Sequence, residues 1–465
     1  MGTLIVKELL AHLYGFRFVI CLVLVPVLFA VSGFVFVKRY EADLDRYNQM
    51  MHANAQGVRE HADKLGEIMW YDQKIMLSPN VLELCAAGHQ RTLPAIFTTD
   101  ANESILPEVS AEANFLLPDF ADIDWVFLVS TVVSLLAFLL GYDMISGERE
   151  AGSLRAILSN SVSRSSVLLS KYIAALIVLV IPLLLGVLFS LIIVLQSGGA
   201  VVDAGVLLRM GVIVLLSLLV LSLCLLLALT VSSYVKSSTT SIVILLLIWG
   251  AWLFVIPGVG GMVARRSAPL PTPSEIEDRI IKMYRQIWDE ETAKDPRLGY
   301  WGPDPTRRNP QGRVRIRKRI MAMERRMRSD HLREMIRQAR CGLTFARFSP
   351  FVLYASASEA VAGTGVFRVE TAWEDLNRYR EDLLSSLVAQ FQLDLPTPYH
   401  IFLYVNEAPY SDQPVDPDLI PQFRERRRSV AESIAAVPMD VALLVLLNVI
   451  LFMVANASFI RADVR

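Results

Sequence analysis

The chain has 465 residues and a formal net charge of −1, and 54% of its residues are hydrophobic. Its mean hydropathy of +0.44 is high for a soluble protein, and the near-zero net charge argues against nucleic acid as a partner. The four cysteines show no metal-ligand spacing, and the chain contains no P-loop and no enzyme motif. We therefore expect no catalytic residue, no metal site and no cofactor in this chain.

Residues 1–37 are predicted to form a short amphipathic helix, Gly2 to Gly15, and then a first membrane span from Phe18 to Val37. A signal peptide is the alternative interpretation, although the apolar run continues past the small residues that resemble a cleavage site. Residues 38–124 are polar. Helical spacing up to about Lys64 is consistent with a continuation of the span, and prolines interrupt the rest.

Residues 125–257 contain four more apolar runs, each close to the ~20 residues that a helix needs to cross a bilayer. The predicted spans are Trp125 to Tyr142, Tyr172 to Leu195, Met210 to Val231 and Ser241 to Pro257. Residues 439–465 supply a sixth span, Val441 to Ile460, and a short tail.

Residues 258–438 form a second polar region. Helices are predicted at Ser274 to Ala293, Gly312 to Ala346, Trp373 to Gln392, and from about Pro417 onward into the sixth span. The basic run from Arg307 to Arg328 has two interpretations. It is either the solvated face of a long helix or a surface for anionic headgroups or an acidic partner.

An even number of spans places both ends of the chain on one side of the membrane. Lysine and arginine are frequent in the short segments on that side, whereas the linker from Gln196 to Ala204 on the other side has none. This bias predicts cytoplasmic termini. The predicted fold is therefore an all-α membrane protein with six transmembrane helices and two mainly helical extracytoplasmic insertions that pack together.

Few polar groups interrupt the predicted spans. None of the spans contains Asp, Glu, Lys, Arg or His, which argues against energy from an ion gradient. We interpret Asn448 and Asn456 in the sixth span as helix–helix hydrogen-bonding residues. Cys85 and Cys341 fall one in each outer region, and we hypothesise that they form a disulfide in an oxidising compartment.

The charged segment from Gly141 to Lys171 lies between the second and third spans. Acidic residues begin it, and Leu154, Ile157 and Leu158 then recur at helical spacing to form an apolar stripe. Such a helix rests on lipid headgroups or fits a groove of a cytoplasmic partner.

Residues Ile145 to Tyr172, ISGEREAGSLRAILSNSVSRSSVLLSKY, resemble the signature of ABC-2 type transporter permeases. Ser161 and Ser170 are mild departures, since proline and glycine are frequent at these positions. Residues 345–365, FARFSPFVLYASASEAVAGTG, are similar to a stretch of a subgroup with large outer insertions after the first and fifth spans. We interpret Gly363 and Gly365 there as a helix C-cap and turn with positive φ.

The resemblance implies a multi-pass subunit of the bacterial inner membrane with a separate ABC ATP-binding subunit, which would bind ATP and Mg. The N-terminal helix would be an interfacial elbow, and residues 146–160 a coupling helix that docks on the ATPase. The expected ATPase-coupling residues are Glu148, Arg149, Glu150, Gly152, Leu154, Arg155 and Leu158. Lys236 in the turn between the fourth and fifth spans would be a second cytoplasmic contact.

Two functional hypotheses follow for the whole chain. The first is the permease of an ATP-driven exporter or mechanotransmitter, assembled with a second permease that is either identical or related. The second is a membrane receptor or scaffold, in which the outer segments bind a periplasmic partner and nothing crosses the bilayer. A membrane enzyme is the weakest hypothesis, because no catalytic set is visible.

Overall fold

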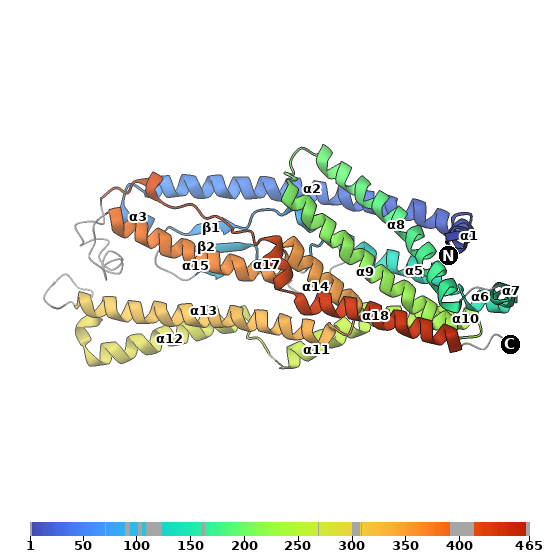
Figure 1. Cartoon of the computed structure of the whole chain (residues 1–465). Coiled ribbons are helices and arrows are strands. Elements are labelled where there is room, and N and C mark those ends of the chain that lie inside the picture. The colour runs from blue at the N-terminus through green and yellow to red at the C-terminus, as the bar shows by residue number, and fades with distance from the viewer. Residues whose placement is uncertain are drawn as a thin grey trace.

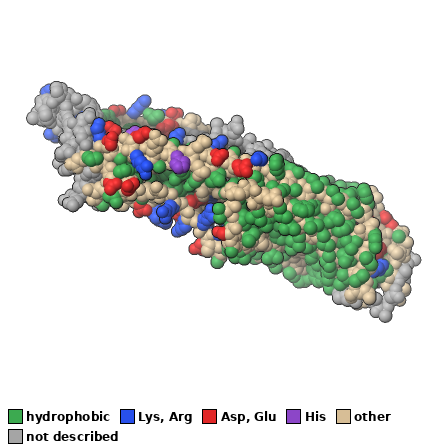
Figure 2. Space-filling model, turned by 90° about the horizontal axis from the view of Figure 1, so that it is seen from above, with side chains coloured by type: hydrophobic (Ala, Val, Ile, Leu, Met, Phe, Trp, Pro, Cys, Tyr) green, Lys and Arg blue, Asp and Glu red, His purple; other side chains and the backbone are tan. Residues whose placement is uncertain are grey.

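The computed structural model describes residues 2–69, 71–88, 94–100, 105–107, 123–159, 163–267, 269–299, 307, 309–390 and 413–461. The protein is an elongated bundle in which α1 (Gly2–Leu13) and the end of α18 (Pro438–Arg461) lie at the same end (Figure 1). Hydrophobic side chains cover the half nearest this end, and charged side chains gather over the other half (Figure 2). We call these the apolar half and the polar half, and the end with α1 the terminal face.

Within the described residues, six helical segments are long and apolar enough to cross a membrane, which confirms the predicted helical fold with six spans. Two of them are composite. The second contains α4 (Trp125–Leu128), η3 (Val129–Val133), α5 (Ser134–Gly141) and α6 (Ser146–Glu150), and the fifth contains α10 (Ser238–Gly250), η4 (Ala251–Val255) and α11 (Ile256–Ser267). Their bounds are Phe16–His61 (α2), Trp125–Glu150, Arg164–Gln196 (α8), Ala204–Tyr234 (α9), Ser238–Ser267 and Pro438–Arg461 (α18).

Short polar side chains fix where three of these helices begin. Asp124, Ser163 and Asp203 each accept a hydrogen bond from the backbone N–H three residues later, at 2.7, 3.2 and 2.7 Å. Such N-caps satisfy donors that the first helical turn leaves without partners. The second, third and fourth spans therefore have defined starting points in the local sequence.

The helix α2 does not stop at the membrane boundary. It runs for 46 residues without a break, a length of about 69 Å at 1.5 Å per residue, and reaches well into the polar half (Figure 1). This confirms that the first span continues as a helix beyond Val37.

The helix α9 forms the centre of the apolar half, where it packs against α5 (Ser134–Gly141), α14 (Pro350–Ala362) and α18. Asn448 of α18 accepts a hydrogen bond from Ser222 of α9 at 2.6 Å and donates one to the carbonyl of Leu219 at 3.1 Å. The helix–helix interpretation of Asn448 is thus confirmed. The Oδ1 of Asn456 is buried without a hydrogen bond.

The second and fifth spans each contain one π-helical turn, η3 (Val129–Val133) and η4 (Ala251–Val255). The two spans are joined close to both turns, where Trp249 Nε1 donates to Ser134 Oγ at 3.1 Å. Turns of this type locally widen a helix and are frequent at functional sites.

Two of the helices predicted in the polar half are confirmed as α12 (Pro273–Lys294) and α13 (Pro310–Ala346), and the third is part of the longer α15 (Gly365–Gln390). In the basic run of α13, Ile316 and Ile320 are buried against α12. The helix expected from Pro417 is wrong. Only the short turns η7 (Pro417–Leu419) and α17 (Val430–Ala435) precede α18, because prolines at 414, 417 and 421 remove backbone donors and disfavour helical residues before them.

A small antiparallel sheet in the first polar segment was not predicted. Its strands are β1 (Gln73–Met76), β2 (Ile96–Thr99) and β3 (Leu106–Pro107), in the order β1-β2-β3. The short elements α3 (Leu65–Ile68) and η1 (Val81–Leu84) lie on either side of β1 in the chain.

The two polar segments pack together, as predicted. Leu65 and Ile68 share one hydrophobic cluster with Leu383 and Leu387 of α15. A second cluster joins the sheet to α15, through the β-strand residues Ile75 and Phe97 and the helix residues Ala372 and Leu376.

The helix α14 connects the polar half to the spans. Almost all of its side chains are buried, and Tyr354 bonds Ser217 of α9 at 2.6 Å. Gly363 and Gly365 follow it with φ of +68° and +62°, which confirms their interpretation as a C-cap and turn.

Candidate functional site

The end of the second span segment and the residues that follow it fold as two short helices, α6 (Ser146–Glu150) and α7 (Ser153–Leu158), at the terminal face (Figure 1). Gly152 separates them with φ of +70°, and a Cβ added there would meet no atom within 4 Å. The backbone angle, not crowding, therefore favours glycine at this turn. We call Ser146–Leu158 the hairpin.

A buried cation connects the hairpin to two other helices. The Nζ of Lys171 in α8 lies 2.6 Å from Oε1 of Glu148 and 3.1 Å from Oε2 of Glu8 in α1, and its side chain is only 3% exposed. Burial would raise the pKa of Glu8, but the ammonium group of Lys171 more than offsets it, so the pKa lies below its usual value. One lysine thus holds α1, α6 and α8 together.

The end of α9 is fastened to the hairpin by Arg149. Its guanidinium donates to the carbonyls of Val235 at 2.9 Å and Ser233 at 3.0 Å. The last carbonyls of a helix lack partners within the helix and carry partial negative charge, so a cation there is favourable.

The start of α10 (Ser238–Gly250) is fastened to the hairpin by Glu150. Its carboxylate accepts hydrogen bonds from the backbone N–H and the Oγ of Ser238, both at 2.9 Å. The N-cap residue Ser237 makes no side-chain capping bond, so Glu150 supplies this acceptor from another element. Ser146 and Ser232 add a buried contact, with the Ser146 N–H donating to Ser232 Oγ at 3.0 Å.

The remaining coupling residues divide between the inside and the outside of the protein. Leu154 is 1% exposed and packs in the main hydrophobic core, so it faces the spans. Gly152 and Lys236 are exposed, together with Ala151 and Ser153 of the hairpin. The side chains of Arg155 and Leu158 lie outside the described part, as does Asn160 at the end of the predicted coupling segment.

The structure therefore gives Glu148, Arg149, Glu150 and Leu154 internal partners. Sequence reasoning assigned these residues to an ATPase contact and missed Glu8, Lys171, Ser232 and Ser238. A detectable signal existed only for Lys171, a single cation just before a long apolar run.

The cysteine pair expected in the outer regions is not bonded. Cys85 and Cys341 are free thiols. Cys85 is fully buried beside the second span, where its carbonyl accepts from Val126 N at 3.0 Å. Cys341 lies on α13, and its neighbour Gly342 packs against Ala264 of α11 (Ile256–Ser267). The two cysteines thus lie against different elements and are unbonded in this structure.

A family model for ABC-2 family transporter proteins matches residues 3–464, nearly the whole chain. The chain belongs to the ABC-2 transporter family. This family comprises membrane components that are not themselves the ATPase and that pair with an ABC ATP-binding subunit. No curated protein matches the sequence. The hairpin of this ABC-2 protein contains the ISGERE motif, and its contacts show what the motif does within the chain.

Proposed function

We propose that this ABC-2 protein is the permease subunit of an ATP-driven transporter and that its terminal face is cytoplasmic. A separate ATP-binding subunit would dock there, and a second permease, identical or related, would complete the assembly. One observation carries the proposal. The charged side chains of the hairpin bind α8, α9 and α10, and Lys171 of α8 links them to α1, yet the turn at residues 150–153 is exposed.

The contacts of the hairpin suggest how movement would pass into the membrane. A push on the exposed turn reaches α8 through Glu148 and Lys171, the end of α9 through Arg149, and the start of α10 through Glu150. ATP and Mg would be bound by the partner, which supplies the hydrolysis. The residues of this chain only receive and distribute the displacement.

Co-purification and ATPase stimulation test this proposal. Ala151→Trp places a bulky side chain on the exposed turn and removes no internal contact of Glu148, Arg149 or Glu150. Val201→Trp is the matched control, because Val201 is 79% exposed in the linker at the other end of α8. We expect Ala151→Trp to lower ATPase stimulation at least tenfold and Val201→Trp to leave it unchanged. Equal stimulation by both variants would contradict docking at the hairpin.

A second candidate function is a mechanotransmitter whose polar half acts on an extracytoplasmic partner. The continuous α2 and the buried α14 favour it, because both join the spans to the polar half without a flexible linker. Transport assays in sealed vesicles separate the two functions. ATP-dependent movement of a solute or lipid supports the transporter, and ATPase coupling without any such movement supports the mechanotransmitter.

A further inference from the structure

A cavity of about 220 Å³ lies where the start of α9 meets the end of α14 and the chain segment 425–428. It is at the boundary between the apolar and polar halves, on the side away from the terminal face. Five arginines line it, namely Arg209, Arg368, Arg426, Arg427 and Arg428. Which of these charges are already neutralised decides what the cavity can bind.

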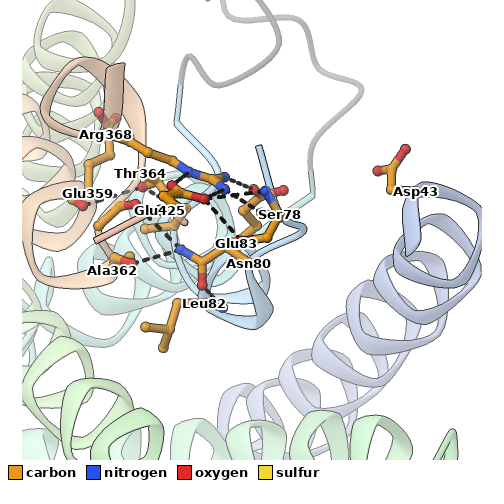
Figure 3. A network of polar contacts seen from close by, with 12 residues as sticks. Asp43, Ser78, Asn80, Leu82, Glu83, Glu359, Ala362, Thr364, Arg368 and Glu425 are labelled. Atoms are coloured by element: carbon orange, nitrogen blue, oxygen red, sulfur yellow. Dashed lines mark hydrogen bonds and ion pairs between the residues drawn. The ribbon is translucent and has the colours of Figure 1, made fainter. Parts of the chain in front are cut away.

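One of the arginines is fully committed to internal partners. Arg368 lies between Glu425 and Glu83, with nitrogen–oxygen distances of 2.7 and 3.1 Å (Figure 3). Glu83 also pairs with Arg39 at 3.4 Å. Burial would lower the pKa of Arg368, but the carboxylate of Glu425 more than offsets this, so the pKa is raised. These four residues form a network of alternating charge, and its members Arg368 and Glu425 line the cavity as a neutral pair.

A second arginine is paired at the surface. Arg426 lies 3.2 Å from Glu374 and 3.8 Å from Asp375, both on α15. The cation that it brings to the rim is therefore balanced by carboxylates outside the cavity.

The other three arginines form no ion pair within 4 Å in the described part of the chain. Arg209 is half-buried and donates to backbone carbonyls, that of Val361 at 2.5 Å and that of Arg428, with no carboxylate within 4 Å among the described residues. The guanidinium groups of Arg427 and Arg428 form no hydrogen bond within the described chain. Two carboxylates line the cavity: Glu425 is paired with Arg368, and Asp203 accepts the N-cap hydrogen bond of Val206. Outside the lining, Glu432 interacts electrostatically with Arg428. The cavity thus has an excess of positive charge.

The cavity lies at the level of lipid headgroups. Arg209 is the sixth residue of α9, about 8 Å along the axis from the first residue of the span. The adjacent Leu207 and Leu208 are 47% and 58% exposed and belong to the apolar surface. A bilayer around that surface would bring its phosphate groups to the height of the cavity.

We propose that this cavity binds a phosphate group and that an anionic phospholipid headgroup supplies it. Guanidinium groups match phosphate oxygens with paired, charge-assisted hydrogen bonds. A partly enclosed phosphate would offset the repulsion among Arg209, Arg427 and Arg428, none of which forms an ion pair within 4 Å in the described chain. This site is independent of the coupling proposal, because it lies at the other end of the spans.

Lipid retention by the full-length protein in nanodiscs tests the site. The double variant R427Q/R428Q removes two cations that have no internal hydrogen bond, and R424Q removes an exposed arginine of the same segment that does not line the cavity. Native mass spectrometry would measure the phosphatidylglycerol that stays bound in mixed phosphatidylglycerol–phosphatidylcholine nanodiscs. We expect a loss of at least tenfold in R427Q/R428Q and none in R424Q. Equal retention by all three proteins would overturn the site.

A second arm distinguishes the source of the phosphate. Inorganic phosphate is added to the protein in pure phosphatidylcholine nanodiscs, with chloride at equal ionic strength as the control, and the thermal unfolding midpoint is measured. A shift with phosphate, absent in R427Q/R428Q and without selective lipid retention, assigns the site to a soluble phosphate. No shift and no selective retention overturns the proposal. Wild-type-like unfolding of R427Q/R428Q in phosphatidylcholine alone shows that the variant is folded.

Discussion

The Nε of Arg347 lies 2.6 Å from Oδ1 of Asp440, which joins the end of α13 to the first turn of the sixth span. The other oxygen of Asp440 accepts from Ser356 of α14 at 2.9 Å, and the Asp440 side chain is only 2% exposed. A carboxylate is also favourable near a helix N-terminus. Asp440 therefore fixes the polar half to the membrane helix that ends the chain.

Replacing Asp440 with alanine should weaken this junction. The variant leaves Arg347 and Ser356 without their acceptor. Because the Arg347 side chain is 35% exposed, the expected cost is that of a hydrogen bond to a charged group, roughly 1.5–3 kcal/mol. Asp418→Ala is the control, because Asp418 is exposed and a surface change costs about 0.5 kcal/mol or less. Thermal unfolding in detergent should show a clearly lower midpoint for Asp440→Ala only. Matching midpoints would mean that the junction adds nothing to stability.

Lys171 offers a second matched comparison. Lys171→Met leaves the carboxylates of Glu8 and Glu148 close together without their cation, and we expect a loss of roughly 3–5 kcal/mol of unfolding free energy. Lys7→Met removes a cation that also pairs with Glu8, at 3.4 Å, but is 55% exposed, so the expected loss is about 1 kcal/mol or less. Unfolding curves of the two variants decide whether burial of the pair matters.

Glu359 predicts a pH-dependent stability. Its carboxyl group packs between Gly88 and Gly365. A Cβ added to either glycine would lie within 2.5 Å of an atom of this carboxyl group. Burial raises its pKa from 4.5 to about 7. Because the folded state binds the proton more tightly, stability should fall as pH rises from about 4.5 to 7 and stay level above that. The difference in pKa corresponds to about 3 kcal/mol.

The variant Glu359→Gln should remove this dependence. At pH 5 it should match the wild type, and at pH 8 it should be more stable, because no buried carboxylate forms. Glu381→Gln, at an exposed position of α15, should show no change with pH relative to wild type. A Glu359→Gln midpoint that tracks the wild type across this range would contradict the buried-acid explanation.

The two outer cysteines should differ in reactivity. Burial raises the pKa of the Cys85 thiol well above its usual value, and the side chain is inaccessible, whereas Cys341 is partly exposed. A membrane-impermeant maleimide should label C85S but not C341S until the protein is unfolded. With the terminal face inside sealed vesicles, labelling of C85S should need no permeabilisation. Labelling only after permeabilisation would reverse the proposed orientation.

The spans could be predicted because each is an apolar run of the right length, a property of the local sequence. Their limits could not. The helices α8 and α18 begin earlier than the predicted third and sixth spans and thereby include Lys171 and Asp440, which are 2% and 1% exposed. A span predicted from hydropathy ends at a charged residue. The helix itself continues through that residue when a partner elsewhere in the fold neutralises the charge.

The hairpin was located by its motif, but the direction of its side chains was not. The partners of Glu150 and Lys171 lie 88 and 163 residues away in the chain, so no local spacing indicates them. The sheet was missed for a related reason, because strands of four residues or fewer hold too little alternation to stand out.

The unbroken α2 has a mechanical consequence. A rigid helix of about 69 Å turns a small tilt at one end into a larger displacement at the other. The helix α1 lies beside the start of α2, and α3 lies near its end (Figure 1). A tilt of about 5° at the terminal face would sweep the far end through about 6 Å, given that length. A small movement of α2 at the terminal face would thus become a movement of several ångströms in the polar half, because no break in the helix lies between the two.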